Sequence, residues 1–194
     1  MRKVIVSIFL TLDGSFEGPN KELDWHVWDD EMEEYMSDLL NNVDTILLGR
    51  VAYQLLAEYW PTAIPKTTMP RNPGEEHPFI FEKMNTLSKI ILSKTLDKVE
   101  WKNSTLIKEN VKAEILRLKH QPGKDLVLFG GANIASTLLR LGLIDEYRII
   151  LNPVILSSGN PFFKDIRDKL SLKLLGTKVF DCGNVLLYYQ PVKK

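Results

Sequence analysis

Short apolar runs alternate with helical stretches along most of the chain, and this alternation constrains the fold more than any other feature. The first run, residues 4–12, is rich in β-branched and aromatic side chains and is followed by Asp13-Gly14, as expected of a central strand. Because strands that alternate with helices form a parallel sheet with helices on both faces, the pattern predicts a mostly parallel α/β fold. The other short runs are residues 45–48, 89–93, 125–129 and 147–151.

Amphipathic stretches separate these runs. One carries an apolar stripe at helical spacing, formed by Met32, Tyr35, Met36, Leu39 and Leu40. Asp29 or Asp30 is placed to cap this helix, and Glu33, three residues after Asp30, gives a box-like pattern. The other predicted helices are residues 51–59, residues 111–119 and a stretch that carries Ile134, Leu138 and Leu141.

Two further regions complete the organisation of the chain. Residues 61–78 hold five of the ten prolines, so we expect a long loop without regular structure, of the kind that is usually functional or mobile. Residues 172–180 and 185–190 are close-set strand candidates, which predict a hairpin and an antiparallel edge. Because the sequence shows no internal repeat and no domain boundary, we expect a single α/β domain over residues 1–194.

Composition excludes several classes of function. The 25 basic and 25 acidic residues give no net charge, which argues against binding to nucleic acid or to a membrane surface. Cys182 is the only cysteine, so an internal disulfide is impossible, and no apolar run approaches the ~20 residues of a membrane span. We therefore expect a cytoplasmic protein. Three histidines and one cysteine at unrelated spacings do not support a metal site.

Two strand-to-helix turns carry glycine, at Leu48-Gly49-Arg50 and at Phe129-Gly130-Gly131. A helix start presents unpaired N–H groups and a partial positive charge, which suit a phosphate, and glycine lets a ligand approach the backbone closely. Arg50 adds a permanent cation with fork geometry. For either turn alone, the equally good interpretation is a tight turn without a ligand.

A third turn favours the interpretation that these turns bind a ligand. Ser93-Lys94-Thr95 follows the apolar run that ends at Leu92 and combines two hydroxyls with an ammonium group. Taken alone, such a tripeptide is more often a solvated turn. Because ligands of α/β sheets gather at the carboxyl ends of the strands, all three turns are expected on one rim. Three such turns suit a dinucleotide.

The chain resembles the dihydrofolate-reductase-like family, close to the C-terminal reductase domain of the bifunctional deaminase/reductase of bacterial riboflavin biosynthesis. The resemblance implies a dihydrofolate-reductase-like fold and an NADPH-dependent reductase. Its substrate would be a small heterocycle or carbonyl compound, as for a 5-amino-6-(5-phosphoribosylamino)uracil reductase. Seven matching pieces follow the family's order over nearly the whole chain, namely residues 7–14, 46–53, 59–61, 89–96, 126–132, 143–147 and 153–159.

The resemblance also implies a binding site for NADPH. Gly49 and Arg50 would hold phosphate groups, with Ser93 and Lys94 on the adenosine side. Ala52 stands where the family usually has threonine, so one hydrogen bond to a phosphate is expected to be missing. The turn and helix under the pyrophosphate would consist of Gly130, Gly131, Ala132, Asn133 and Ile134.

The catalytic group is open to several interpretations. Dihydrofolate reductases use a carboxylate on the first helix, and Asp29, Asp30 and Glu33 compete for that position, although helix capping explains all three. The resemblance places the corner at Asp13 near the nicotinamide and the substrate. Asp13 is therefore our catalytic candidate, although an Asp-Gly pair is first of all a turn.

His26 lies between Trp25 and Trp28. This cluster could stack on a flat heterocycle, and the competing interpretation is structural packing.

Two alternatives to the reductase also stay open, a true dihydrofolate reductase and a non-catalytic cofactor- or ligand-binding protein. The second is favoured by Ala52 and by the lack of a clear acid.

The resemblance further implies a homodimer, because reductase domains of this family commonly pair. The two tail strands carry more apolar side chains than one face of an edge hairpin normally buries, and exposed edges of this kind attract a partner. The competing explanation is an internal hairpin packed under a helix.

Overall fold

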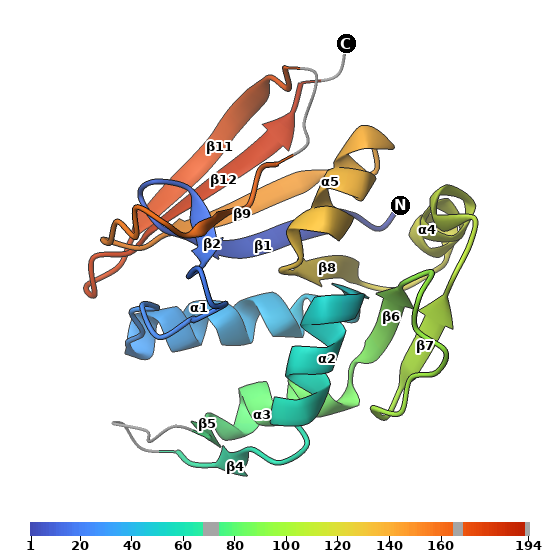
Figure 1. The fold of residues 1–194 in the computed structure, drawn as a ribbon, viewed down its shortest axis with the longest axis horizontal. Coiled ribbons are helices and arrows are strands. Elements are labelled where there is room, and N and C mark those ends of the chain that lie inside the picture. Colours follow the sequence, from blue (N-terminus) through green and yellow to red (C-terminus); the bar gives the residue numbers. More distant parts are fainter. Residues whose placement is uncertain (68–73, 165–168, 193–194) are drawn as a thin grey trace.

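The computed structural model describes residues 1–67, 74–164 and 169–192 of the chain. Its centre is an eight-stranded sheet with the order β11-β12-β9-β1-β8-β3-β6-β7, which runs through the middle of the molecule (Figure 1). The strands of this sheet are β1 (Val4–Leu10), β3 (Val43–Gly49), β6 (Ser88–Leu92), β7 (Ser104–Ile107), β8 (Asp125–Phe129), β9 (Glu146–Leu151), β11 (Leu172–Val179) and β12 (Val185–Pro191).

Six neighbouring strands of the sheet, from β9 to β7, are parallel. Strand β12 then pairs antiparallel with β9, and β11 pairs antiparallel with β12 and forms the edge. The predicted fold, a mostly parallel α/β sheet with an antiparallel pair at the C-terminal end, is confirmed.

In the described part of the chain, five helices cover the two faces of this sheet. They are α1 (Asp30–Asn41), α2 (Arg50–Tyr59), α3 (Pro78–Thr86), α4 (Val111–His120) and α5 (Ala132–Arg140). Each of them fits within the length of an ordinary globular helix. None of the helices in the described part of the chain is long and apolar enough to cross a membrane.

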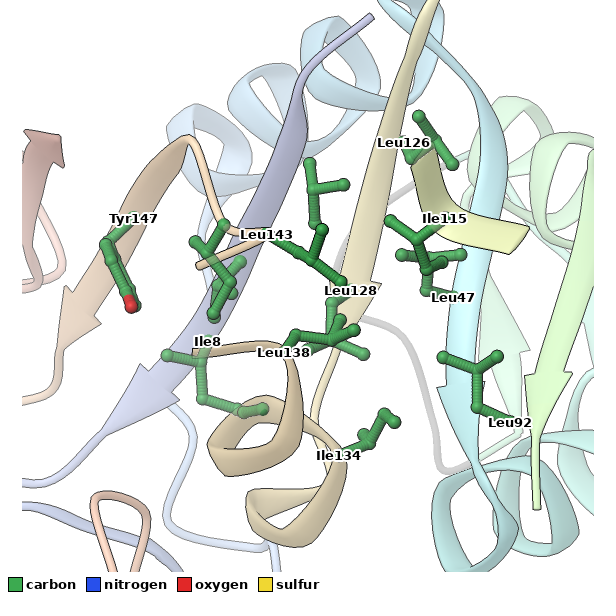
Figure 2. Close-up of a cluster of buried hydrophobic side chains, with 14 of the residues drawn as sticks. Ile8, Leu47, Leu92, Ile115, Leu126, Leu128, Ile134, Leu138, Leu143 and Tyr147 are labelled. Atoms are coloured by element: carbon green, nitrogen blue, oxygen red, sulfur yellow. The ribbon is translucent and has the colours of Figure 1, made fainter. Parts of the chain in front are cut away.

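Alternation along the central strands divides the core into two clusters. Along β1, Val4, Val6 and Ile8 point into a cluster that also holds side chains of α4 and α5, whereas Phe9 packs on the opposite side. The second cluster holds side chains of α1, α2 and α3. Figure 2 shows the first cluster, where strands and α5 contribute among others Ile8, Leu128, Ile134 and Leu138.

Helix α1 follows the predicted stripe. All five residues of that stripe are buried, and Asp29 is the N-cap, with its carboxylate accepting a hydrogen bond from the backbone N–H of Met32 at 2.8 Å. The prediction of a box with Glu33 is wrong, because the residue three positions after the cap is Met32.

The proline-rich region is more regular than predicted. Ile64–Pro65 (β4) pairs with Glu75–Glu76 (β5), and Pro78 begins α3 instead of ending a loop. Proline favours the first turn of a helix, where its missing N–H costs nothing. The prolines at positions 70 and 73 lie outside the described residues. Two other features were not predicted, strand β7 and the small pair formed by β2 (Ser15–Glu17) and β10 (Asn160–Pro161).

Candidate active site

A cleft of about 1190 Å³ opens at the carboxyl ends of the parallel strands. Gly49, Leu92 and Phe129, the last residues of β3, β6 and β8, line it together with Phe9 near the end of β1. This is the edge at which α/β sheets bind their ligands. Its volume exceeds the roughly 300–1,000 Å³ of a pocket for one small molecule.

One side of α1 and one side of α2 form the walls of the cleft. On α1 the lining residues are Glu33, Met36 and Leu40, whose spacing places them on one helix face. Helix α2 has ten residues and is therefore ~15 Å long, so its two ends belong to different parts of the cleft. The lining residues that belong to α2 are Arg50, Val51, Ala52, Leu55, Leu56 and Tyr59.

The part of the cleft at the start of α2, which we call the glycine half, contains two helix starts. Gly49 caps α2 and Gly131 caps α5, neither helix receives a cap from a side chain of the described residues, and neither has an acidic residue in its first turn. The N–H groups at both starts therefore keep their capacity to bind an anion, and the helix dipoles favour it.

Ile134 holds the two helix starts together. A Cβ atom added at Gly49 or at Gly131 would lie 3.1 Å from the Cγ2 atom of Ile134, so the same methyl group packs against both turns. Gly130 and Gly131 also adopt φ angles of +70° and +83°, which L side chains rarely adopt. Glycine is therefore required here for conformation and, at Gly131, for space.

Two cations line the glycine half. Arg50 is exposed and makes no hydrogen bond or ion pair with the described residues. Lys164 was not predicted, because nothing in its sequence surroundings distinguishes it. Its backbone carbonyl accepts a hydrogen bond from the Ser136 hydroxyl at 2.9 Å, which fixes this residue beside α5.

The structure brings most of the predicted cofactor residues together. The lining of the cleft includes Gly49, Arg50, Gly130, Gly131, Ala132, Asn133 and Ile134. It also includes Ala52, whose methyl group offers no hydrogen bond.

Ser93 and Lys94 follow Leu92 but are not lining residues of the cleft. The Ser93 hydroxyl accepts hydrogen bonds from the N–H groups of Thr95 and Leu96 at 3.2 and 3.1 Å. These bonds form the turn that the tripeptide predicts. A contact of Ser93 and Lys94 with a cofactor stays a prediction.

The other part of the cleft, which we call the aromatic half, is lined by Phe9, His26, Trp28, Tyr59 and Trp60. The Phe9 ring stacks on His26 at 4.6 Å and on Trp28 at 5.8 Å between centroids. Burial lowers the pKa of His26 to about 4, so its ring is neutral at physiological pH.

The three candidate carboxylates on the first helix have different positions. Asp29 caps the helix and accepts a second hydrogen bond from the Cys182 N–H at 2.8 Å, and Asp30 is exposed and outside the lining. Glu33 lines the cleft, and its Oε1 atom lies 3.6 Å from Nε2 of His77. Of these three residues, Glu33 is the one that lines the cleft.

Asp13 has a different environment from the one expected of a catalytic group. It is exposed and is not among the residues that line the cleft. Its carboxylate accepts hydrogen bonds from the Thr11 hydroxyl and from the Ser157 N–H, the latter at 2.9 Å. The Thr11 bond is the main cause of a lowered pKa, so Asp13 is ionised and holds two loops together. This position gives no support to a catalytic role.

Metal ligation has no basis in the described part of the chain, which contains no group of three or more His, Cys, Asp or Glu residues suited to a metal ion. The groups that line the cleft include the two helix starts, Arg50 and Lys164, the aromatic wall and Glu33.

Sequence comparison finds relatives that match nearly the whole chain. The model of the RibD C-terminal domain family matches residues 2–186. YyaP of Bacillus subtilis (strain 168), an uncharacterized protein, is 36% identical over 188 residues, which cover 97% of this chain and 94% of YyaP.

Solved structures share the fold. A Shewanella sp. PV-4 protein assigned to riboflavin biosynthesis superposes with a TM-score of 0.77 at 20% identity, over 99% of this chain and all of that one. A Thermotoga maritima diaminohydroxyphosphoribosylaminopyrimidine deaminase/5-amino-6-(5-phosphoribosylamino)uracil reductase gives 0.67 at 15% identity, over 98% of this chain and 57% of that longer one. Dihydrofolate reductase from Enterococcus faecalis, complexed with NADP(H) and RAB-propyl, gives 0.64 at 14% identity, over 98% of this chain and 97% of that enzyme.

Proposed function

The chain belongs to the RibD C-terminal domain family, and from this premise we propose that it is an NADPH-dependent reductase that transfers a hydride to a small heterocyclic or carbonyl substrate. Membership of the family supports a reductase-type function. The dihydrofolate-reductase-like fold, which a structure complexed with NADP(H) shares, supports the choice of cofactor.

The observation that carries the proposal is the pair of helix starts in the glycine half. Two uncapped starts beside Arg50 fit the linked phosphates of a dinucleotide, since each start supplies N–H donors and Arg50 supplies a charge. A single phosphate would need only one of them.

The rest of the cleft fits the nicotinamide and the substrate. The bound cofactor would supply the hydride. Phe9, His26 and Trp28 would stack on the substrate and exclude water, and Glu33 would orient it from α1 through a hydrogen bond. Glu33 thus replaces Asp13 as our candidate for the polar group that contacts substrate.

Titration with NADPH, followed by the fluorescence of the bound nicotinamide, tests the proposal directly. We expect saturable binding and, with pyrimidine, pterin or carbonyl substrates, oxidation of NADPH at 340 nm. Absence of NADPH binding to the folded protein would contradict the proposal.

One observation favours a second candidate, a cofactor-binding protein without turnover. Ala52 lines the cleft where the resemblance leads us to expect threonine, and its methyl group cannot donate to a phosphate. The two candidates differ in one measurement, because the binding protein would retain NADPH without oxidising it in the presence of any substrate.

We also propose that the protein acts as a cytoplasmic homodimer. The single cysteine supports a reducing compartment. Strand β11 supports the dimer, since it is an edge strand whose apolar side chains Leu174, Leu175 and Val179 are exposed. This exposure argues against a hairpin packed under a helix.

A further inference from the structure

Ser7 is a buried polar residue in the floor of the cleft. It is 3% exposed, and its Oγ atom has no hydrogen-bond partner of normal geometry among the described residues. Nearly all buried polar atoms in folded proteins have a partner, so this hydroxyl needs an explanation. Ser7 also lines the cleft, two residues before Phe9 on the same face of β1, and it therefore borders the stacking wall of the aromatic half. A ring bound there can supply the missing partner.

A row of polar side chains continues from Ser7 across the sheet. Ser7 is in register with Arg148 of β9, and Arg148 is in register with Tyr188 of β12, so the three side chains are on one face. The Nε atom of Arg148 donates a hydrogen bond to the Glu146 carboxylate at 2.7 Å, and the guanidinium carbon lies 5.5 Å from the centroid of the Tyr188 ring. Arg148, Glu146 and Tyr188 do not line the cleft. Ser7 is therefore the end of the row that a ligand reaches.

Tyr35 of α1 connects Ser7 with Arg148. Its hydroxyl is buried and, like that of Ser7, has no hydrogen-bond partner of normal geometry among the described residues. Burial is the main cause that raises the pKa of Tyr35 to about 12, while the charge of Arg148 and, more weakly, the Ser7 hydroxyl act against it. Both groups are therefore neighbours of the Tyr35 hydroxyl, which itself does not line the cleft.

The chemistry of these groups fixes the direction of the hydrogen bonds that the row can make. A guanidinium only donates, so a hydrogen bond between Arg148 and Tyr35 uses the phenol oxygen as the acceptor. The proton of the Tyr35 hydroxyl is then available to the Ser7 oxygen, which leaves the Ser7 O–H free to donate to a ligand. Because the positive charge at one end polarises the donors that follow it, this hydroxyl is a stronger donor than an isolated serine.

We propose that the Ser7 hydroxyl donates a hydrogen bond to the substrate, and that the substrate is a flat ring whose edge toward β1 carries an acceptor, either a carbonyl oxygen or an unprotonated ring nitrogen. Ser7 contacts the substrate, whereas Tyr35 and Arg148 are positioning residues that act through it. The inference rests on the proposed function, because it takes the aromatic half as the substrate site. It adds a polar contact on the floor of the cleft to that of Glu33 on the α1 wall.

The test uses planar probes with and without an acceptor. Lumazine, pterin and 5-amino-6-(5-phosphoribosylamino)uracil carry carbonyl oxygens, whereas indole, the control ligand, has an N–H donor and no such acceptor. Binding to the full chain is measured by titration calorimetry, with and without saturating NADP⁺. We expect at least one of the three carbonyl-bearing probes to bind, and Ser7→Ala to weaken it about three- to tenfold while it changes the affinities for indole and NADPH by less than about twofold.

Two further variants connect the effect to the row of polar groups. Ser104→Ala is the matched control, since Ser104 on β7 also has a buried hydroxyl without a partner among the described residues but does not line the cleft. It should leave the affinity for every probe unchanged. Tyr35→Phe should weaken the same probe as Ser7→Ala, and the two effects should not add in the double variant, because Tyr35 acts through Ser7. A purely structural role of Tyr35 would make the two effects additive.

The outcomes separate this inference from the proposed function. Unchanged affinity of Ser7→Ala for the carbonyl-bearing probes, or no binding of any of the three to the unchanged protein, would overturn the inference even if NADPH binds. If Ser7→Ala does not fold, Ser7→Cys takes its place with the same expected loss, because a thiol keeps the shape and donates only weakly. Failure of NADPH to bind would contradict the proposed function, while the titrations without NADP⁺ still decide whether Ser7 holds the ring.

Discussion

The guanidinium of Arg50 is at the first turn of α2, on the cleft and without a partner among the described residues. Hydrogen bonds to a charged group contribute about 1.5–3 kcal/mol, so Arg50→Gln should weaken NADPH roughly 10- to 150-fold. We expect Arg50 to contact the ribose phosphate of NADPH as well as the linked phosphates, so NADH, which lacks the ribose phosphate, should lose less affinity. Fluorescence titration of both nicotinamides measures the difference.

Arg117→Gln is the control for this prediction, because Arg117 is on α4 and pairs with Glu114 away from the cleft. It should change neither affinity. Equal affinities of the unchanged protein for NADPH and NADH would contradict the assignment of Arg50 to the ribose phosphate.

The neutral ring of His26 makes the stability of the protein depend on pH. Burial lowers the pKa of this residue from 6.5 to about 4, so between these values the unfolded chain binds a proton that the folded chain does not. The free energy of unfolding therefore falls as the pH drops from about 6.5 to 4, by on the order of 3 kcal/mol. Urea unfolding at several pH values measures this loss.

His26→Phe should remove most of that loss. Phenylalanine keeps the stacking on Phe9, and Nε2 of His26 has no hydrogen-bond partner among the described residues to leave unpaired. His120→Gln, at the end of α4, is the control that should retain the pH dependence of the unchanged protein. If the free energy of unfolding of His26→Phe fell at acid pH as much as that of the unchanged protein, other groups would be its cause.

At the scale of elements, the pattern of apolar residues predicted the helices and strands whose burial follows the local sequence. The stripe of α1 is confirmed because burial on one helix face repeats every 3.6 residues, and the central strands are confirmed because continuous apolar runs mark strands that are buried on both faces. Helix α3 was missed because the prolines before it, and Pro78 itself, indicated a loop, and β7 was missed because it is short and partly polar. Strand β7 depends on β6 for its hydrogen bonds.

The candidate site was predictable only in part. Gly49 and Gly131 carry a local signal, because a glycine between a strand and a helix marks an open helix start. Glu33 could have been selected over Asp29 by its spacing with Met36 and Leu40, which share its helix face. Lys164 could not, since it reaches the cleft only through the contact of its loop with α5.

The start of α5 gives a prediction at this scale. Gly131→Val would place a β-branched side chain against Ile134, in a turn with a φ angle of +83°. We expect a folded protein that is less stable by about 1–3 kcal/mol and that no longer binds NADPH measurably. Thermal unfolding and cofactor titration measure the two effects.

Gly142→Val at the other end of α5 is the matched control. Gly142 has a φ angle of +66°, no atom lies within 4 Å of an added Cβ, and it does not line the cleft. This variant should lose stability and keep its affinity for NADPH. Unchanged NADPH affinity in a folded Gly131→Val protein would show that the cofactor binds elsewhere.

At the scale of the whole molecule, the sheet has two unlike edges. Strand β7 ends it on one side, next to α4 in Figure 1, and β11 ends it on the other, where Val179 is 69% exposed. An apolar edge strand with unpaired backbone groups is a surface that proteins usually cover. Pairing of two copies through β11 would cover it symmetrically.

We therefore expect light scattering at micromolar concentration to give about twice the chain mass of 22.3 kDa. A stable interface should bury at least ~1,000 Å² with an apolar centre, so Val179→Lys on β11 should shift the mass toward that of the monomer. Ile64→Lys, in the exposed strand β4 at the opposite end of the molecule, should not. A monomer mass that persists as the concentration rises would mean that β11 is left as a free edge, and that this chain does not share the pairing expected of its family.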